Sequence, residues 1–195
     1  MMVMALLMTM WEKKPTDMVD VQKVCPAIRV ELRYMTKYNG VGRAVYPKGS
    51  RCLLRRGVVE RLCRVQKRLA PQGLGLKIWD GYRPLSAQRA LWEIKPDSRF
   101  VAPPSRGSKH NRGAAVDLTL VDRQGKELAM PSDFDTFSVK AHPDYQGGTR
   151  EQRHNRDVLH KAMTAEGFQT AKYEWWHFHD PDWRRYRLTD VALKL

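Results

Sequence analysis

Two short stretches of the chain carry side chains that commonly bind metal ions. Residues 108–117 include His110 and Asp117, and residues 174–177 include His177 together with a glutamate. Two imidazoles and one carboxylate can hold a single metal ion, and the glutamate would supply a spare carboxylate. About sixty residues separate the two stretches. Only the fold can therefore bring them together.

The spacing within the first stretch requires a change of chain direction. His110 and Asp117 are seven positions apart, so an unbroken strand would point them to opposite faces. Residues 111–113 are Asn-Arg-Gly, and both Asn and Gly tolerate the positive φ of tight turns. We therefore expect a turn there, followed by a strand over residues 114–120. That strand would bury alternate apolar side chains and carry Asp117 on its other face.

The second stretch leaves its local geometry open. Regular strand alternation would put His177 and His179 on one face and Glu174 on the other. Glu174 and His177 can share a site only if the strand starts late or bulges, or if a helical turn places them at positions i and i+3. On strand geometry alone, His179 competes with His177 for the role of metal ligand.

Both stretches match, in order, the pattern S-x-H-x-x-G-x-x-x-D followed by E-x-W-H, and Asp-Gly-Tyr-Arg-Pro stands upstream at residues 80–84. This combination resembles the zinc D-alanyl-D-alanine dipeptidases of the D-Ala-D-Ala metallopeptidase family. The resemblance covers about residues 20–179. It implies that His110, Asp117 and His177 bind one Zn²⁺ per chain. Three such ligands with an open fourth position describe a catalytic rather than a structural zinc site.

The same resemblance implies roles for three further residues. Glu174 would be the general base, Arg83 would stabilise the oxyanion, and Ser108 would help to hold the dipeptide. The alternatives are a solvated or salt-bridged Glu174, an Arg83 that only pairs with Asp80, and an ordinary loop serine. The remaining histidines lack such a context and are expected to be ordinary surface or partly buried residues: His142, His154 and His160.

The resemblance implies hydrolysis of D-alanyl-D-alanine to two D-alanines, in peptidoglycan precursor metabolism or wall-peptide recycling. A D,D-carboxypeptidase or endopeptidase acting on longer wall peptides is the alternative enzyme, and a non-catalytic zinc-binding module is the alternative outside enzymes. A closed pocket that anchors both termini would favour the dipeptidase, and an open groove the carboxypeptidase. Residues 130–135 resemble the family's M-G-T-x-F-D stretch, but Pro131 and Ser132 replace Gly and Thr. This departure concerns fine substrate specificity more than the chemistry.

The composition and charge of the chain indicate which classes of partner it is expected to bind. The chain has 195 residues and a formal net charge of +14, but its basic residues are scattered rather than gathered in one run. We therefore expect no specific nucleic acid as partner, and the resemblance implies a small D,D-dipeptide as ligand. The apolar residues 1–11 are too short to span a bilayer and lack the basic start of a signal peptide. The cytoplasm is the expected compartment, with the periplasm or cell envelope as the alternative if this segment is a remnant export signal. The sequence leaves the oligomeric state open.

The mixture of predicted helices and strands indicates one α+β domain. The resemblance implies that its central sheet is mainly antiparallel and flanked by helices, as in the D-Ala-D-Ala metallopeptidases. Residues 1–19 would form an extension, and residues 20–195 the zinc dipeptidase domain. A loop is expected over residues 95–109, where it could form a wall of the substrate cleft. The predicted strands cover residues 28–34, 74–79 and 114–121. The predicted helices cover residues 57–70 and 86–93, and a third begins at an N-cap at Asn155 and ends at Gly167.

Overall fold

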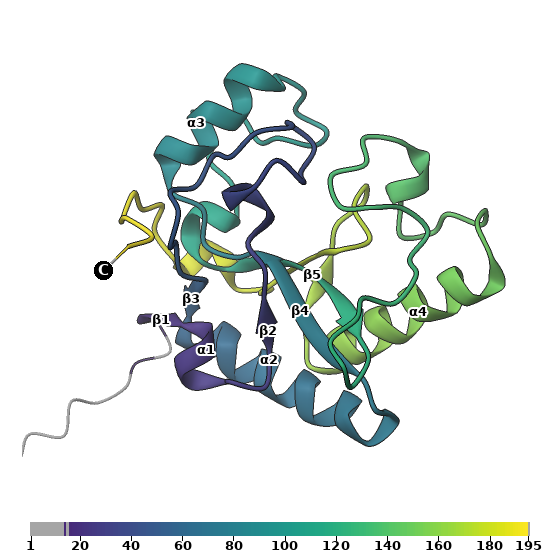
Figure 1. Cartoon of the computed structure of the whole chain (residues 1–195). Helices are drawn as coiled ribbons and strands as arrows, with labels where there is room; N and C mark the ends of the chain where they lie inside the picture. Colours follow the sequence, from purple (N-terminus) through teal and green to yellow (C-terminus); the bar gives the residue numbers. More distant parts are fainter. Residues whose placement is uncertain (1–13, 15, 195) are drawn as a thin grey trace, which may run out of the picture.

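A five-stranded sheet forms the centre of the computed structural model, which describes residue 14 and residues 16–194 (Figure 1). In this sheet β2 runs parallel to β4, and the other neighbours are antiparallel. A separate antiparallel pair joins β1 (Met18–Asp20) to β3 (Leu53–Arg55). The strands of the central sheet, in spatial order, are β2 (Arg29–Val30), β4 (Gly75–Asp80), β5 (Ala115–Val121), β7 (His177–His179) and β6 (Gln169–Thr170). The α+β architecture with a mainly antiparallel sheet is as the sequence predicted.

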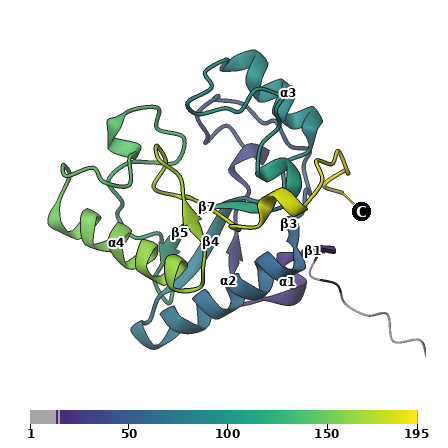
Figure 2. The same ribbon diagram turned by 180° about the vertical axis from the view of Figure 1, so that it is seen from behind.

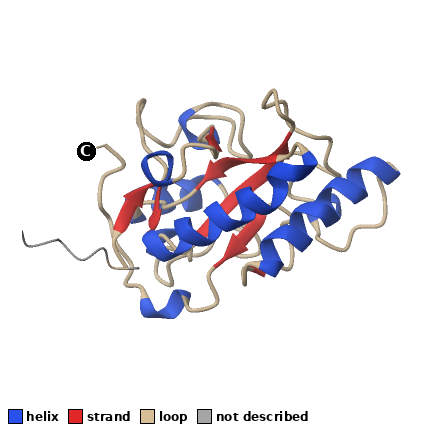
Figure 3. Cartoon of the chain, turned by 90° about the horizontal axis from the view of Figure 1, so that it is seen from below, coloured by secondary structure: helices blue, strands red, loops and turns tan. Residues whose placement is uncertain are grey.

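The helices of the described residues are α1 (Val21–Val24), α2 (Arg56–Leu69), α3 (Leu85–Ile94) and α4 (Arg150–Ala165). The two long helices α2 and α4 contact each other and lie across one face of the sheet (Figure 3). The apolar stripe that predicted α2 is buried, including Leu62 and Val65. Helix α3 and the loops around it lie away from α2 (Figure 1). They stand above the ends of β4 and β5, where the candidate site residues emerge.

The strand predicted over residues 28–34 is shorter than expected. Only Arg29–Val30 pairs with β4, and a 3-10 turn over Arg33–Met35 follows. The side chains of Thr36 and Asn39 both donate to the Arg33 carbonyl, at 2.9 and 3.2 Å. Such local bonds offer the backbone an alternative to a strand ladder. The alternation nevertheless located buried residues correctly, because Leu32 and Tyr34 are both buried.

The prediction that Asn155 caps a helix is wrong. Helix α4 starts at Arg150, and its N-cap is Thr149, six residues before Asn155. Thr149 and Gln152 form a capping box, in which each side chain accepts a hydrogen bond from the other's backbone N–H. Asn155 is instead buried within the helix and donates to the Ala129 carbonyl at 2.9 Å. The helix is followed by Gly167 with φ of 83°, as predicted.

The C-terminal segment packs against the turn that carries His110. The backbone N–H of Thr189 donates to the Asn111 carbonyl at 3.1 Å, and the backbone N–H of Arg51 donates to the Leu193 carbonyl at 3.0 Å. Figure 2 shows this yellow segment beside β3 and α3. Among the described residues, no helix is long and apolar enough to cross a membrane. The apolar residues 1–11 lie outside the described part of the chain. All three cysteines are free thiols.

Candidate active site

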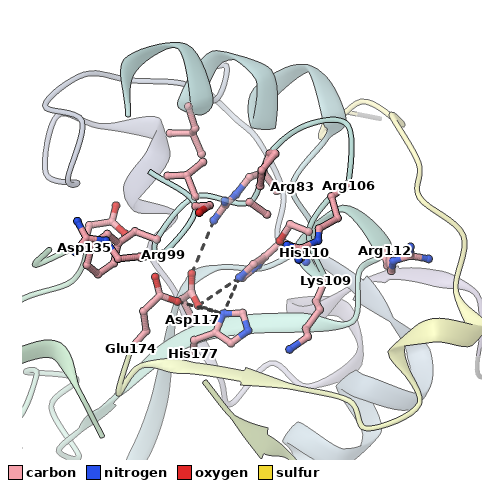
Figure 4. A pocket seen from close by; sticks show the side chains of 18 of the residues that line it. Arg83, Arg99, Arg106, Lys109, His110, Arg112, Asp117, Asp135, Glu174 and His177 are labelled. Carbon is pink, nitrogen blue, oxygen red and sulfur yellow. Dashed lines mark hydrogen bonds and ion pairs between the residues drawn. The ribbon is translucent and has the colours of Figure 1, made fainter. Parts of the chain in front are cut away.

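His110, Asp117 and His177 meet at one point although they come from three separate elements. His177 Nδ1 lies 3.0 Å from Asp117 Oδ1, and His110 Nε2 lies 3.3 Å from the same oxygen and 3.1 Å from His177 Nδ1. All three side chains are buried. Figure 4 shows the two rings and the carboxylate pointing toward one another. The sequence therefore identified three residues that the fold brings together as a possible metal site.

The expected turn positions His110. A 3-10 turn covers His110–Arg112 and ends at Gly113, whose φ is 67°. That positive φ favours glycine, and a Cβ at this position would also displace the Met18 side chain, whose sulfur would lie 2.6 Å away. His110 Nδ1 donates to the Gly81 carbonyl at 2.7 Å. This bond fixes the tautomer that leaves the Nε2 lone pair facing Asp117 and His177.

Strand pairing positions the other two residues. Asp117 and His177 are register partners on β5 and β7. Strand β7 begins only at His177, because residues 174–177 form a turn in which the His177 N–H donates to the Glu174 carbonyl at 3.3 Å. Glu174 Oε2 thereby lies 3.8 Å from His177 Nδ1. Of the geometries left open by the sequence, the late strand start with an i, i+3 turn is the one adopted.

The surroundings of Asp117 and Glu174 shift the pKa values of their carboxyls in opposite directions. Burial raises the pKa of Asp117, but the facing His110 and His177 more than offset it, and the pKa stays below its usual range. Burial and the nearby carboxylates of Asp117 and Asp135 raise the pKa of Glu174 well above its ordinary value. One carboxylate is thus held ionised, and the other binds a proton readily.

Arg83 is fixed in place by buried acceptors. Its Nε and Nη2 donate to Asp80 Oδ2 at 3.0 and 2.6 Å, and its Nη1 donates to Gln88 Oε1 at 3.1 Å. Tyr46 donates to the other Asp80 oxygen at 2.6 Å. A guanidinium has five N–H donors, so three are committed and two remain on Nη1 and Nη2. Nη2 lies 3.9 Å from Asp117 Oδ2, beside the possible metal site.

These groups line one pocket of about 570 Å³. The loop 95–109 forms part of its wall, as the sequence predicted. Its acidic side chains lie apart from most of its basic ones. In Figure 4, Asp135 and Glu174 lie on one side of Asp117, together with Arg99, which is paired with Asp97, whereas Lys109 and Arg112 lie on the other side.

The cluster fits a zinc ion. Tetrahedral zinc with bonds of about 2.0–2.1 Å separates its ligand atoms by about 3.3 Å. The separations of 3.0, 3.1 and 3.3 Å found here are close to that value. Two imidazole nitrogens and one carboxylate oxygen are also a common donor set for zinc.

Comparison with known proteins identifies the family. The family model described as D-Ala-D-Ala dipeptidase matches residues 14–191. The chain belongs to the D-Ala-D-Ala dipeptidase family. It is 36% identical to the D-alanyl-D-alanine dipeptidase of Escherichia coli K12 over 173 residues, which cover 89% of each chain. It is 31% identical to the D-alanyl-D-alanine dipeptidase of Enterococcus faecalis, and the match covers 77% of this chain and 85% of the relative. It is 34% identical to that of Streptomyces coelicolor, and the match covers 83% of this chain and 90% of the relative.

In this member of the dipeptidase family, Ser108 lies at the pocket wall. Its Oγ accepts the backbone N–H of His110 at 3.1 Å, which leaves the hydroxyl hydrogen free to donate. His179 is excluded from the possible metal site, because its ring faces Lys109, whose Nζ lies 2.9 Å from Nε2. Burial and the nearby Arg184 lower the pKa of that Lys109 ammonium.

Sequence reasoning missed Asp135. It lines the pocket, is 9% exposed, and accepts the Gly40 N–H at 3.0 Å. Its φ of 56° is in the left-handed region, which Asp tolerates better than most residues. The M-G-T-x-F-D resemblance marked this stretch, and that signal, together with the acidic side chain at its end, could have identified it. The other histidines lie outside the pocket lining: His142, His154 and His160.

Proposed function

We propose that this chain is a zinc dipeptidase that hydrolyses D-alanyl-D-alanine to two D-alanines. The observation that carries the proposal is the close approach of the ligand atoms of His110, Asp117 and His177, with Glu174 beside them in the same pocket. Family membership supports the substrate, and the donor set supports the metal. One Zn²⁺ per chain would be held by these three residues.

Three ligands from the chain would leave the fourth position of a tetrahedral zinc ion to a water molecule or the substrate. A zinc ion bound there supplies Lewis acidity, which lowers the pKa of a water from about 15.7 to about 7 and polarises a carbonyl. The contribution of the chain is to hold the three ligand atoms close together before the ion arrives. Asp117 is kept ionised and His110 is kept in the correct tautomer for this purpose.

Glu174 is the group that moves protons. Its carboxylate lies beside the cluster, where it can take a proton from the attacking water and deliver it to the leaving amine. The carboxyl must hold the proton between the two steps. The salt-bridged surface role considered from the sequence does not fit a side chain that is 17% exposed and lines the pocket.

Arg83 and Ser108 would stabilise the substrate's oxygen atoms. The two uncommitted N–H groups of Arg83 are held rigidly by Asp80 and Gln88, so they need no reorganisation to meet a developing oxyanion. The pairing with Asp80 that the sequence offered as an alternative therefore serves the catalytic role. The Ser108 hydroxyl can donate to the dipeptide.

The polarity of the pocket favours a free dipeptide. Asp135 on the acidic side can bind the substrate's ammonium, and Lys109 on the basic side can attract its carboxylate. Anchoring both termini favours the dipeptidase over a D,D-carboxypeptidase, whose substrates extend beyond the amino side. The compartment decides the role, since cytoplasmic action fits precursor metabolism and envelope action fits wall recycling. Cell fractionation separates these two.

A substrate panel tests the proposal. Release of D-alanine is measured from D-Ala-D-Ala, from L-Ala-L-Ala and from a pentapeptide ending in D-Ala-D-Ala, with the zinc-loaded protein. Cleavage of the D,D-dipeptide alone is the expected result. Faster cleavage of the pentapeptide would move the assignment to a carboxypeptidase. No release of D-alanine from any of the three substrates, with zinc bound, would favour a non-catalytic zinc-binding module.

A further inference from the structure

Three cations gather on one aromatic ring in the wall of the pocket. Lys109 Nζ lies 5.7 Å from the centroid of the Trp183 ring, and the guanidinium carbons of Arg112 and Arg184 lie 5.2 and 4.4 Å from it. All four residues line the pocket. Contacts of this length are within the range of cation–π attraction. We call this group the Trp183 cation cluster.

The cluster has no counter-charge of its own. Lys109 contacts the His179 ring, and Arg112 donates to the Tyr186 carbonyl, so both use neutral acceptors. None of the three cations forms an ion pair with a carboxylate among residues 16–194. Of the pocket's other arginines, Arg83 pairs with Asp80 and Arg99 with Asp97, at 2.6 and 2.7 Å, whereas Arg106 also has no carboxylate partner among the described residues.

The position of the cluster relates it to one end of the substrate. This step rests on the proposed function, in which the peptide bond lies at the His110, Asp117 and His177 site and the ammonium lies toward Asp135. The C-terminal residue then extends toward Lys109, on the basic side. Its carboxylate supplies one negative charge against three positive ones.

We propose that the Trp183 cation cluster is a binding subsite for a second anionic group, carried by the side chain of the substrate's C-terminal residue. Dipeptides such as D-Ala-D-Glu are the substrate class that fits. A pocket of about 570 Å³ is in the size range that buries a drug-sized ligand, so two alanines leave part of it unfilled. An added carboxylate would form charge-assisted hydrogen bonds with Arg112 or Arg184.

The test compares an acidic dipeptide with its neutral isostere. kcat/KM is measured for D-Ala-D-Glu and D-Ala-D-Gln at low ionic strength, with the wild type, Arg184→Gln and Arg185→Gln. Arg185 is the matched control, because it neighbours Arg184 but lies near Asp180 and Asp182, at 3.8 and 3.9 Å, and outside the pocket lining.

The wild type should prefer D-Ala-D-Glu by roughly tenfold, and added salt should shrink that preference. Arg184→Gln should reduce the preference to about twofold, and Arg185→Gln should leave it unchanged. Equal kcat/KM values for the two dipeptides in the wild type, or equal losses in both variants, would overturn the subsite.

Failure of the proposed function gives a different result. If no dipeptide is hydrolysed, including D-Ala-D-Ala, the dipeptidase assignment fails. Calorimetric Kd values for D-Ala-D-Glu and D-Ala-D-Gln on the same zinc-loaded protein then decide the subsite independently. Tighter binding of the acidic dipeptide, lost in Arg184→Gln only, upholds it. Equal Kd values overturn it.

Discussion

The Nε2 atom of His110 lies 3.1 Å from the Nδ1 atom of His177, which follows it by 67 positions in the chain. Asp117 Oδ1 is within 3.3 Å of both nitrogens. Because the Nδ1 hydrogen of His110 is donated to the Gly81 carbonyl, two neutral rings place at most one N–H, that of His177 Nδ1, among these three atoms. At least two electron-pair acceptors then face each other in a buried site, which costs free energy. A cation at the centre of the three atoms removes that cost.

Zinc is therefore expected to stabilise the folded protein. At a free zinc concentration a thousandfold above Kd, the free energy of unfolding should rise by about 4 kcal/mol. His177→Ala should lose most of this gain, because one ligand is missing. His154→Ala is the control, since His154 is exposed on α4. Thermal unfolding with and without zinc measures the effect, and an equal zinc shift in both variants would refute the ligand assignment.

Glu174→Gln should retain zinc and lose hydrolysis. The amide is almost isosteric but cannot take a proton from water, so kcat should fall by about 10²- to 10⁴-fold. Steady-state kinetics, together with the zinc content of the same preparation, provide the measurement. Glu93→Gln, at an exposed position on α3, should behave as the wild type. A Glu174→Gln enzyme with near-normal kcat would rule out the proton-transfer role.

Arg83→Lys should lower kcat by about 10²- to 10³-fold with a smaller change in KM, because an ammonium cannot hold both Asp80 and an oxyanion in the fork geometry of a guanidinium. Asp80→Asn should act in the same direction but less strongly, since it loosens the guanidinium without removing it. Arg89→Lys is the matched control, because Arg89 pairs with Asp190 at the surface. A loss confined to KM would contradict oxyanion stabilisation.

Much of the site could be predicted because its signals are local. Glycine at position 113 and the alternation in β5 are enough to require a turn after His110 and to place Asp117. The relation of Glu174 to His177 could not be derived, because it depends on where β7 starts pairing with β5. Pairing is a tertiary property, and only the family motif anticipated its result.

Errors in the fold have a similar origin. Asn155 has the chemistry of an N-cap, but Thr149 with Gln152 completes a capping box and starts α4 earlier. Asn155 is then available to bond a carbonyl in the neighbouring loop. Asp135 was missed because its importance comes from burial beside Tyr34 and Gly40, which lie 101 and 95 positions earlier in the chain.

Asp135 predicts a pH dependence of stability. Burial raises the pKa of Asp135 to about 6, above the unfolded value of about 3.9. Between these values the folded state holds a proton that the unfolded state has lost, so the free energy of unfolding falls as pH rises from about 4 to about 6. The loss is on the order of 3 kcal/mol.

Asp135→Asn should remove this slope and be more stable than the wild type at pH 8, while KM for D-Ala-D-Ala rises. Asn also tolerates the positive φ at this position. Denaturant unfolding from pH 4 to pH 8 measures the slope, with Asp133→Asn, at an exposed neighbouring position, as the control. Parallel pH curves for the wild type and Asp135→Asn would contradict the prediction.

Activity followed through removal and return of the metal is the most direct test of a zinc dipeptidase centred on His110, Asp117 and His177. D-alanine release from D-Ala-D-Ala is measured on the purified chain, after a chelator has removed the metal, and during titration with zinc. We predict that activity disappears with the metal and returns in proportion to zinc, with a break at one ion per chain. Full hydrolysis by metal-free protein, or none at one bound zinc per chain, would contradict it.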